Sequence, residues 1–213
     1  MKRIRKSFIA SMCLLTAFVL WTLAICFVDV RAIGPQGSSV GFAGINGFVH
    51  ILTGVHFSLY SITDWLGLVP IFVCVGFGIF GIVQWIKRKS IRKVDYDILV
   101  LGGFYTVTIA VYLFFESVVI NYRPVLINGY LEASYPSSTT LLVMCVMPTA
   151  IMQLGSRIKT KVFRNIIAVT IIAFIAFMVI GRLLSGVHWL TDIVGGTLLS
   201  AGLVMLYCAI IGL

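Results

Sequence analysis

Long apolar stretches separated by short charged segments limit most strongly what this chain can fold into. A helix that spans a lipid bilayer needs about 20 mostly apolar residues. Six segments meet this requirement, although the fourth is the weakest because it contains Pro148: residues 8–29, 66–86, 98–120, 137–154, 166–184 and 193–213. Of the 213 residues, 60% are hydrophobic and 11% are charged, whereas soluble domains are about 25% charged. The sequence therefore predicts an all-α integral membrane bundle of six transmembrane helices, forming a single domain over residues 1–213.

The distribution of basic residues predicts the orientation of this bundle. Thirteen of the 16 Lys and Arg residues lie in three segments, residues 2–6, 87–93 and 157–164. Connections rich in Lys and Arg stay on the cytoplasmic side of a membrane, so both termini are predicted to be cytoplasmic. The net charge of +9 also suits a nucleic-acid-binding protein, but such a protein carries its basic residues on one face of a soluble domain. No nucleic acid partner is therefore expected.

Residues 30–65 form the long first extracytoplasmic connection in this topology. Its first half is rich in Gly and Ser, whereas FVHILTGVHFSLYSITDW, residues 48–65, is amphipathic. An amphipathic stretch of this kind predicts a short helix that lies along the membrane interface. The five cysteines all fall inside apolar runs without paired spacing. We interpret them as small hydrophobic residues rather than as disulfide partners or metal ligands.

Three polar stretches are predicted to reach the extracytoplasmic face. Arg123 lies in NYRPVLING, Ser137 in YPSSTT, and Arg182, His188 and Asp192 in GRLLSGVHWLTDIVGG. Charged side chains at membrane depth are costly and usually mark function. Because an even number of crossings separates the stretches, we expect them to converge.

The residue types in these stretches suit phosphoryl transfer. Arginine binds phosphate oxygens through a planar pair of donors, and a helix that starts at Pro136 and Ser137 offers free backbone N–H groups to an anion. His188 and Asp192 are four residues apart and are predicted to stack on a helix. A carboxylate that accepts one ring N–H leaves the other ring nitrogen free as a nucleophile or a base. The pattern favours a phosphohistidine mechanism.

The stretches RPVLINGYLEASYPSS and GRLLSGVHWLTDIVGG resemble the motifs of the type-2 phosphatidic acid phosphatase superfamily of membrane lipid phosphatases. The family pattern is Lys, six residues and Arg-Pro, then Pro-Ser-Gly-His, then Ser-Arg, five residues, His, three residues and Asp. The resemblance covers roughly residues 65–213, the phosphatase-like core. It implies that His188 and Asp192 are catalytic and that four residues bind the substrate phosphate: Arg123, Arg182, Ser137 and Ser138.

The chain departs from the family pattern at four positions. Glu116 stands at the lysine position, Ser138 and Thr139 replace the Gly-His pair, and Gly181 replaces the serine of the third motif. In the family, the missing histidine is the general acid that protonates the leaving oxygen, and the lysine helps to bind phosphate. Glu116 and Thr139 are therefore candidate substitutes for missing motif positions, and Glu116 is equally suited to be a structural partner of Arg123.

The missing histidine bears on the substrate, because loss of a general acid costs about 10²–10⁴-fold in rate. An alkoxide that leaves a lipid monophosphate needs a proton, whereas a phosphate that leaves a diphosphate has a second pKa of about 6 and departs without one. A polyprenyl diphosphate is therefore the preferred substrate in this hypothesis. Another group could supply the proton instead, and the candidates are Tyr135, Glu116, His50 and His56.

The sequence thus predicts a membrane lipid phosphatase or phosphotransferase whose active site faces outside. It acts on a lipid phosphate or diphosphate, with no cofactor and no metal, because no cluster of carboxylates or histidines offers a metal shell. The alternative is a catalytically weakened or inactive membrane protein that binds or transports lipid phosphates or regulates a partner. The basic connections and the absence of organelle-retention signals favour a plasma membrane, and the size of the chain suits a bacterial one.

Overall fold

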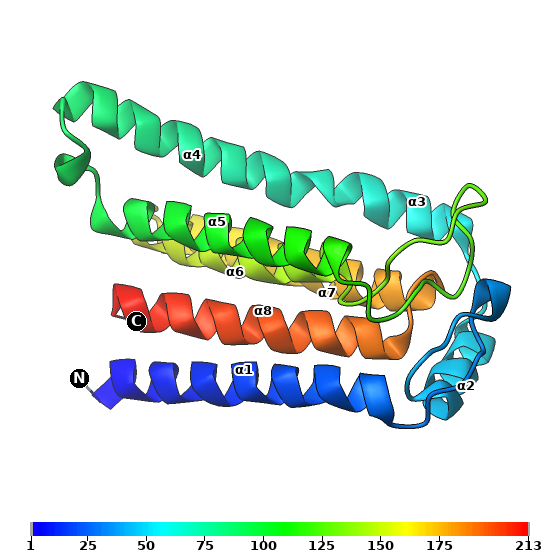
Figure 1. The fold of residues 1–213 in the computed structure, drawn as a ribbon. Helices are drawn as coiled ribbons and strands as arrows, with labels where there is room; N and C mark the ends of the chain where they lie inside the picture. Colours follow the sequence, from blue (N-terminus) through cyan, green and yellow to red (C-terminus); the bar gives the residue numbers. More distant parts are fainter. Residues whose placement is uncertain (1, 213) are drawn as a thin grey trace.

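The computed structural model describes residues 2–212 and is a bundle of long α-helices (Figure 1). Within these described residues, six helices are long and apolar enough to cross a membrane, which confirms the predicted all-α fold class. They are α1 (Lys2–Phe27), α4 (Leu68–Arg88), α5 (Tyr96–Ser117), α6 (Ser138–Arg157), α7 (Lys161–Leu184) and α8 (Leu190–Ile211). The shorter elements are α2 (Ala43–Thr53), α3 (Phe57–Leu66) and the 3₁₀ turns η1 (Pro35–Gly37) and η2 (Ile91–Lys93).

Several spanning helices extend beyond the apolar segments that predicted them. Helix α1 begins at Lys2 rather than at residue 8, and α7 begins at Lys161 rather than at residue 166. Apolar periodicity marks only the part of a helix that faces lipid, whereas Lys and Arg are good helix formers that continue it into water. Pro148 lies inside α6, which runs on to Arg157. The predicted last residue of the sixth helix, Leu213, lies outside the described residues.

The connection over residues 30–65 differs most from its prediction. The chain forms two helices there rather than one, because it breaks at Gly54, whose φ of 66° is left-handed. Helix α3 then runs almost in line with α4 (Figure 1), and together they form one apolar stretch over Phe57–Arg88. Residues 57–66 therefore extend the second spanning helix instead of forming a separate short helix with residues 48–53.

Helices α6 and α8 form the centre of the bundle. Helix α8 packs against α1, α5, α6 and α7, and its small residues permit close approach. The Ser11 hydroxyl of α1 donates a hydrogen bond to the Gly202 carbonyl at 2.8 Å, and a Cβ at Gly202 would lie 2.8 Å from Leu15 Cδ2. Large apolar side chains such as Phe72 and Ile172 are exposed on the outer helices, as expected of a multi-pass membrane protein.

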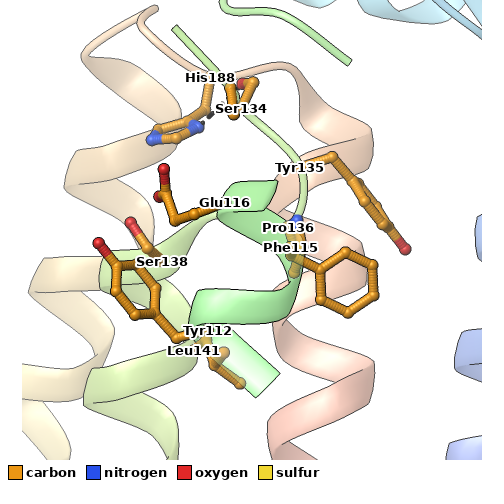
Figure 2. A pocket seen from close by; sticks show the side chains of 10 residues that line it. Tyr112, Phe115, Glu116, Ser134, Tyr135, Pro136, Ser138, Leu141 and His188 are labelled. Atoms are coloured by element: carbon orange, nitrogen blue, oxygen red, sulfur yellow. Dashed lines mark hydrogen bonds between the residues drawn. The ribbon is translucent and has the colours of Figure 1, made fainter. Parts of the chain in front are cut away.

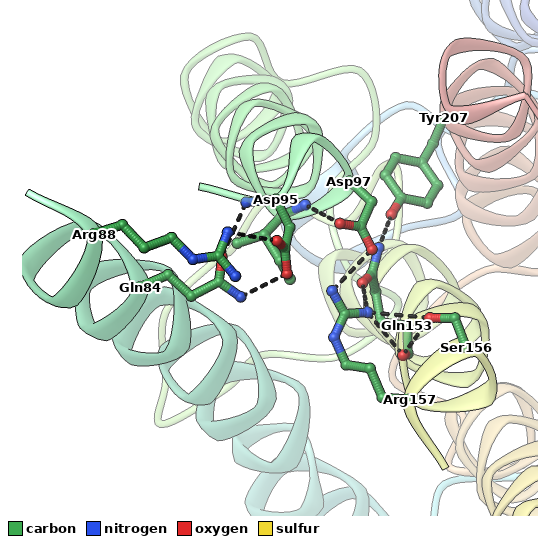
Figure 3. Close-up of polar contacts among 9 residues, drawn as sticks. Gln84, Arg88, Asp95, Asp97, Gln153, Ser156, Arg157 and Tyr207 are labelled. Carbon is green, nitrogen blue, oxygen red and sulfur yellow. Dashed lines mark hydrogen bonds and ion pairs between the residues drawn. The ribbon is translucent and has the colours of Figure 1, made fainter. Parts of the chain in front are cut away.

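The two ends of the bundle differ in character. Both termini lie at one end, together with the α4–α5 connection (Figure 1). A polar network ties helices together there: Arg88 pairs with Asp95 at 2.7 Å, and Arg157 pairs with Asp97 at 2.8 Å (Figure 3). The α5–α6 connection and the α7–α8 turn meet at the opposite end, beside α2 and α3 (Figure 1).

Candidate active site

The polar residues singled out in the sequence converge at the end of the bundle away from the termini. Arg182 lies in the last turn of α7, His188 in the turn before α8, and Asp192 in the first turn of α8. Arg123 comes from the α5–α6 connection, and Ser137 is the N-cap of α6. All five are buried, with exposed fractions between 0 and 9%, so each needs partners inside the protein.

His188 and Asp192 do not stack on a helix as predicted, because His188 precedes α8 and the helix starts at Leu190. Their nearest atoms, His188 Nδ1 and Asp192 Oδ2, are 3.7 Å apart. The Ser134 hydroxyl lies between them: its oxygen is 3.1 Å from His188 Nδ1, and it donates a hydrogen bond to Asp192 Oδ2. Asp192 Oδ2 also accepts the Trp189 N–H at 2.8 Å. The aspartate therefore orients the imidazole through a serine.

The start of α6 is joined to this group through its backbone. The Ser137 N–H donates to the Asp192 carbonyl at 3.1 Å, and the first intrahelical bond runs from the Leu141 N–H to the Ser137 carbonyl. The three amides between them, at residues 138–140, have no acceptor within the helix, as at any helix N-terminus. The Ser137 hydroxyl is fully buried and accepts a hydrogen bond from Thr140 Oγ1 at 3.1 Å.

The two guanidinium groups converge on one aromatic ring of α3. Arg123 Cζ lies 5.8 Å and Arg182 Cζ lies 5.0 Å from the centre of the Tyr60 ring. Arg123 Nε is 3.1 Å from Glu132 Oε2, an ion pair without hydrogen-bond geometry. The acidic partner of Arg123 is thus Glu132 rather than Glu116.

Several buried polar atoms at this place have no hydrogen-bond partner within residues 2–212. They are Nε and Nη1 of Arg123, Nε of Arg182 and Nε2 of His188. Buried polar groups are almost always hydrogen-bonded in folded proteins, so these donors beside the imidazole nitrogen are suited to binding an anion. The donors suit phosphate oxygens, and the imidazole nitrogen suits attack on phosphorus.

A small cavity of about 10 Å³ opens beside His188, which is room for about one water molecule. Glu116, Ser138 and Tyr112 line it, and Figure 2 shows the Glu116 carboxylate between the His188 ring and Ser138. The Tyr135 side chain points away from the His188 ring (Figure 2), and its hydroxyl hydrogen-bonds to Thr22 Oγ1 at 2.7 Å.

A larger cavity of about 440 Å³ adjoins the first one and shares Tyr112, Ser138 and Leu141 with it. It runs between α4, α5 and α6, and its lining is mostly apolar. Thr139, the residue at the position of the family histidine, lines this larger cavity. His50 contacts the Trp189 ring, and His56 Nε2 lies 2.9 Å from the Thr53 carbonyl oxygen. Of the four candidate proton donors, Glu116 has its functional group beside His188.

The surroundings of His188 keep its ring neutral. Burial lowers the pKa of His188 well below its usual value, and the positive charges of Arg123 and Arg182 lower it further. A neutral imidazole has a lone pair on one nitrogen and a proton on the other. The Ser134 hydroxyl donates its hydrogen to Asp192, so its oxygen accepts a hydrogen bond from the N–H at His188 Nδ1. This arrangement leaves the lone pair at Nε2.

Comparison with protein families supports the resemblance of the motifs. The model of the PAP2 superfamily matches residues 101–212, which is more than half of the chain. The chain belongs to the PAP2 superfamily. Among solved structures, it is similar to a transmembrane PAP2-type phosphatidylglycerolphosphate phosphatase from Bacillus subtilis, with a TM-score of 0.60, 17% sequence identity and 93% of each chain covered. At this identity the likeness concerns the fold. A comparison with curated proteins gives no match.

The structure shows what surrounds two of the residues that depart from the PAP2 pattern, Glu116 and Gly181. Glu116, at the lysine position, lines the cavity beside His188. At Gly181, the position of the motif serine, an added Cβ would lie 2.9 Å from Thr63 Cγ2 of α3. The space next to Gly181 is therefore filled by a threonine from another helix.

Sequence reasoning missed the residues that support the motif residues. Ser134 lies two positions before Pro136 of the second motif, and Tyr60 and Thr63 lie in the connection that was predicted to follow the interface. These side chains are uncharged and match no motif position. Their proximity to His188, Arg123 and Arg182 arises only when the α5–α6 connection and α3 fold against the α7–α8 turn.

Proposed function

We propose that the protein is a membrane lipid phosphatase that works through a phosphohistidine. The observation that supports this most directly is the unpaired, buried His188 Nε2, which occurs together with unpaired guanidinium atoms of Arg123 and Arg182. In the proposed reaction, these arginines bind the phosphate oxygens and His188 Nε2 attacks phosphorus. The leaving oxygen departs with the bonding electron pair, and water then hydrolyses the phosphohistidine to release inorganic phosphate. Catalysis rests mainly on positioning and charge stabilisation.

The imidazole proton has a defined place in this mechanism. His188 Nδ1–H donates to the Ser134 oxygen, and Ser134 donates to Asp192. As His188 Nε2 bonds to phosphorus, positive charge develops on the ring, and the Asp192 carboxylate stabilises that charge through the serine. The phosphate-binding roles proposed for Ser137 and Ser138 rest on their place at the start of α6, where helix N-termini favour anions.

The leaving group favours a diphosphate substrate. Thr139 cannot donate a proton as the family histidine does, and the residue that lines the cavity at the lysine position of the family pattern is the acidic Glu116. A phosphate leaving group needs no proton at neutral pH, because its second pKa is about 6. We therefore infer that a polyprenyl diphosphate is turned over faster than the monophosphate of the same lipid. The apolar cavity of about 440 Å³ suits the adjacent part of a lipid chain.

A phosphate-release assay on the purified protein in detergent tests this function. The substrates are a polyprenyl diphosphate and the corresponding monophosphate, and the variants are His188→Asn and Glu116→Gln. We expect release from the diphosphate at least about tenfold faster, and no release by His188→Asn. The Glu116→Gln variant is expected to have a lower KM, because the substitution removes a negative charge beside the phosphate.

The outcomes separate the proposed function from its alternative. Turnover retained in His188→Asn excludes the phosphohistidine mechanism, and equal rates on the two lipids exclude the diphosphate preference. A wild-type protein that binds both lipids but releases no phosphate is the catalytically inactive lipid-phosphate-binding protein. If Glu116→Gln lowers kcat on the monophosphate at unchanged KM, Glu116 is instead the proton donor to the leaving oxygen.

A further inference from the structure

Helix α3 contacts the candidate site although it lies outside residues 101–212, the part of the chain that the family model matches. The contact is fixed by the backbone just before the helix. The His56 N–H donates to the Ser185 carbonyl at 2.9 Å. A Cβ at Gly186 would lie 1.9 Å from the Gly54 carbonyl oxygen, so the two chain segments pass in direct contact. The start of α3 is therefore attached to the turn that carries His188.

Two side chains of α3 contact the guanidinium groups directly. The Tyr60 ring is in cation–π contact with both Arg123 and Arg182, at 5.8 and 5.0 Å. Thr63 Oγ1 accepts a hydrogen bond from Arg182 Nη1 at 3.3 Å, and the Thr63 hydroxyl itself donates to the backbone of its own helix. The Thr63 side chain is fully buried, so its position is set by packing.

These contacts offset the electrostatic repulsion between the two buried guanidinium groups. Two guanidinium groups that bind one phosphate repel each other while the site is empty, and burial strengthens that repulsion. The face of an aromatic ring attracts cations, so one ring shared by two arginines offsets part of the repulsion. The carboxylate nearest to Arg182, Asp64 Oδ1, is 3.5 Å from Nη2 and belongs to a side chain that is 57% exposed. It is therefore a weak partner.

We propose that α3 is a positioning element of the phosphate site, in which Tyr60 holds Arg123 and Arg182 side by side and the Thr63 hydroxyl orients Arg182. In this role Thr63 takes the place of the serine that the third motif lacks at Gly181. Arg123 Nη1 and Arg182 Nε, which have no hydrogen-bond partner within residues 2–212, remain available to the anion. The inference rests on the proposed function, because it assumes that the two arginines bind a phosphate group of the substrate.

Binding of inorganic pyrophosphate to the His188→Asn protein in detergent, measured by isothermal titration calorimetry, tests this role without turnover. Tyr60→Leu removes the aromatic face and is expected to weaken binding about tenfold, whereas Tyr60→Phe keeps the face and should stay within about twofold. Thr63→Val removes the hydroxyl at nearly constant shape and is expected to weaken binding about threefold to tenfold, whereas Thr63→Ser should bind like the parent protein.

A compensating pair of substitutions tests the replacement of the motif serine. Gly181→Ser alone places a Cβ 2.9 Å from Thr63 Cγ2, and Thr63→Ala alone removes the hydroxyl, so each is expected to weaken pyrophosphate binding. The double variant Thr63→Ala with Gly181→Ser has room for the serine and should bind more tightly than either single variant.

Steady-state kinetics on the protein with His188 intact gives a second readout. Tyr60→Leu and Thr63→Val are expected to raise KM by the same factors at nearly constant kcat. Pyrophosphate binding by Tyr60→Leu that equals that of Tyr60→Phe overturns the role of the ring, and a Thr63→Val variant that binds like Thr63→Ser overturns the role of the hydroxyl. If these variants bind pyrophosphate more weakly but the protein with His188 intact shows no turnover, the role of α3 stands and the proposed phosphatase function is rejected.

Discussion

At the scale of single residues, Ser134 determines how the His188 ring and the Asp192 carboxylate interact. The direct distance of 3.7 Å between His188 Nδ1 and Asp192 Oδ2 is too long for a hydrogen bond, and Ser134 closes the gap by bonding to both. Asn121 Nδ2 lies 3.5 Å from the other carboxylate oxygen. The imidazole is therefore oriented by a buried chain of hydrogen bonds, and such chains fail when one member is removed.

The Ser134→Ala variant is expected to lower kcat about 10- to 100-fold with little change in KM, because the hydroxyl contacts His188 and Asp192 rather than the arginines. Phosphate-release kinetics measures both constants. The double variant Ser134→Ala with Asp192→Asn should lose about as much as the more damaging single variant, since both act through His188. Ser200→Ala is the matched control, because Ser200 is an equally buried serine that bonds only within α8. If the double variant instead loses the product of the two single-variant factors in kcat, Ser134 and Asp192 act independently.

The lowered pKa of His188 predicts the pH dependence of activity. In the proposed mechanism the attacking form is the neutral imidazole, and a pKa below 6.5 keeps His188 neutral as the pH falls. The acid limb of kcat/KM that belongs to His188 should therefore lie below pH 6.5. Arg123→Gln removes one of the charges that lower this pKa, so its acid limb should move to higher pH. Arg31→Gln, a change at an exposed arginine paired with Asp29, should leave the limb in place. An Arg123→Gln profile that matches the wild type contradicts this electrostatic coupling.

At the scale of secondary-structure elements, the site depends on how closely loops and helices approach one another. Gly195 of α8 lies against the Tyr135 ring, whose carbon atoms would be 2.4 and 2.7 Å from an added Cβ. A Cβ at Gly196 would lie 3.2 Å from the Ser137 carbonyl oxygen and 3.3 Å from Thr140 Cβ, a tight but looser contact. These contacts hold the start of α6 against the start of α8. The spacing between His188, Ser134 and Asp192 thus depends on glycines that have no chemical role of their own.

Gly186 is the position where a side chain is expected to do most damage. Its φ is 67° and an added Cβ would meet the Gly54 carbonyl oxygen at 1.9 Å, so Gly186→Ala combines backbone strain of about 1–2 kcal/mol with a steric clash. We expect a melting temperature several degrees lower and a strongly reduced turnover, since α3 and His188 flank this contact. Gly102→Ala is the control, because a Cβ there would meet nothing within 4 Å beyond its chain neighbours and the backbone of its own helix. Unchanged turnover in Gly186→Ala would show that this contact does not set the site.

At the scale of the whole molecule, the basic segments and the candidate site lie at opposite ends of the bundle. The termini and the α4–α5 connection lie at one end, and His188 with its partners lies at the other (Figure 1). The end with the termini is held by the Arg157–Asp97 and Arg88–Asp95 pairs (Figure 3). The positive-inside rule places the basic end in the cytoplasm, so the site is predicted to face outside.

Labelling of single cysteines in intact cells tests this orientation. With the five native cysteines replaced, Gln36→Cys lies at the end with the site and Lys89→Cys at the basic end, and both positions are exposed. A membrane-impermeant thiol reagent is expected to label Gln36→Cys directly and Lys89→Cys only after the cells are permeabilised. The reverse pattern would place the site in the cytoplasm and would contradict the predicted topology.

The sequence by itself determined the fold class, the six spanning helices and the family, because hydrophobic length and motif spacing are properties of the chain read in one dimension. It also identified Arg123, Arg182, His188 and Asp192, because ionisable side chains are costly at membrane depth. The tertiary structure alone revealed the serine between His188 and Asp192, the contact of the Tyr60 ring with both guanidinium groups, and the threonine beside Gly181. These residues are small or aromatic and uncharged, so their types carry no local signal. Their roles follow from neighbours that are far away in the sequence and are brought close only by helix packing.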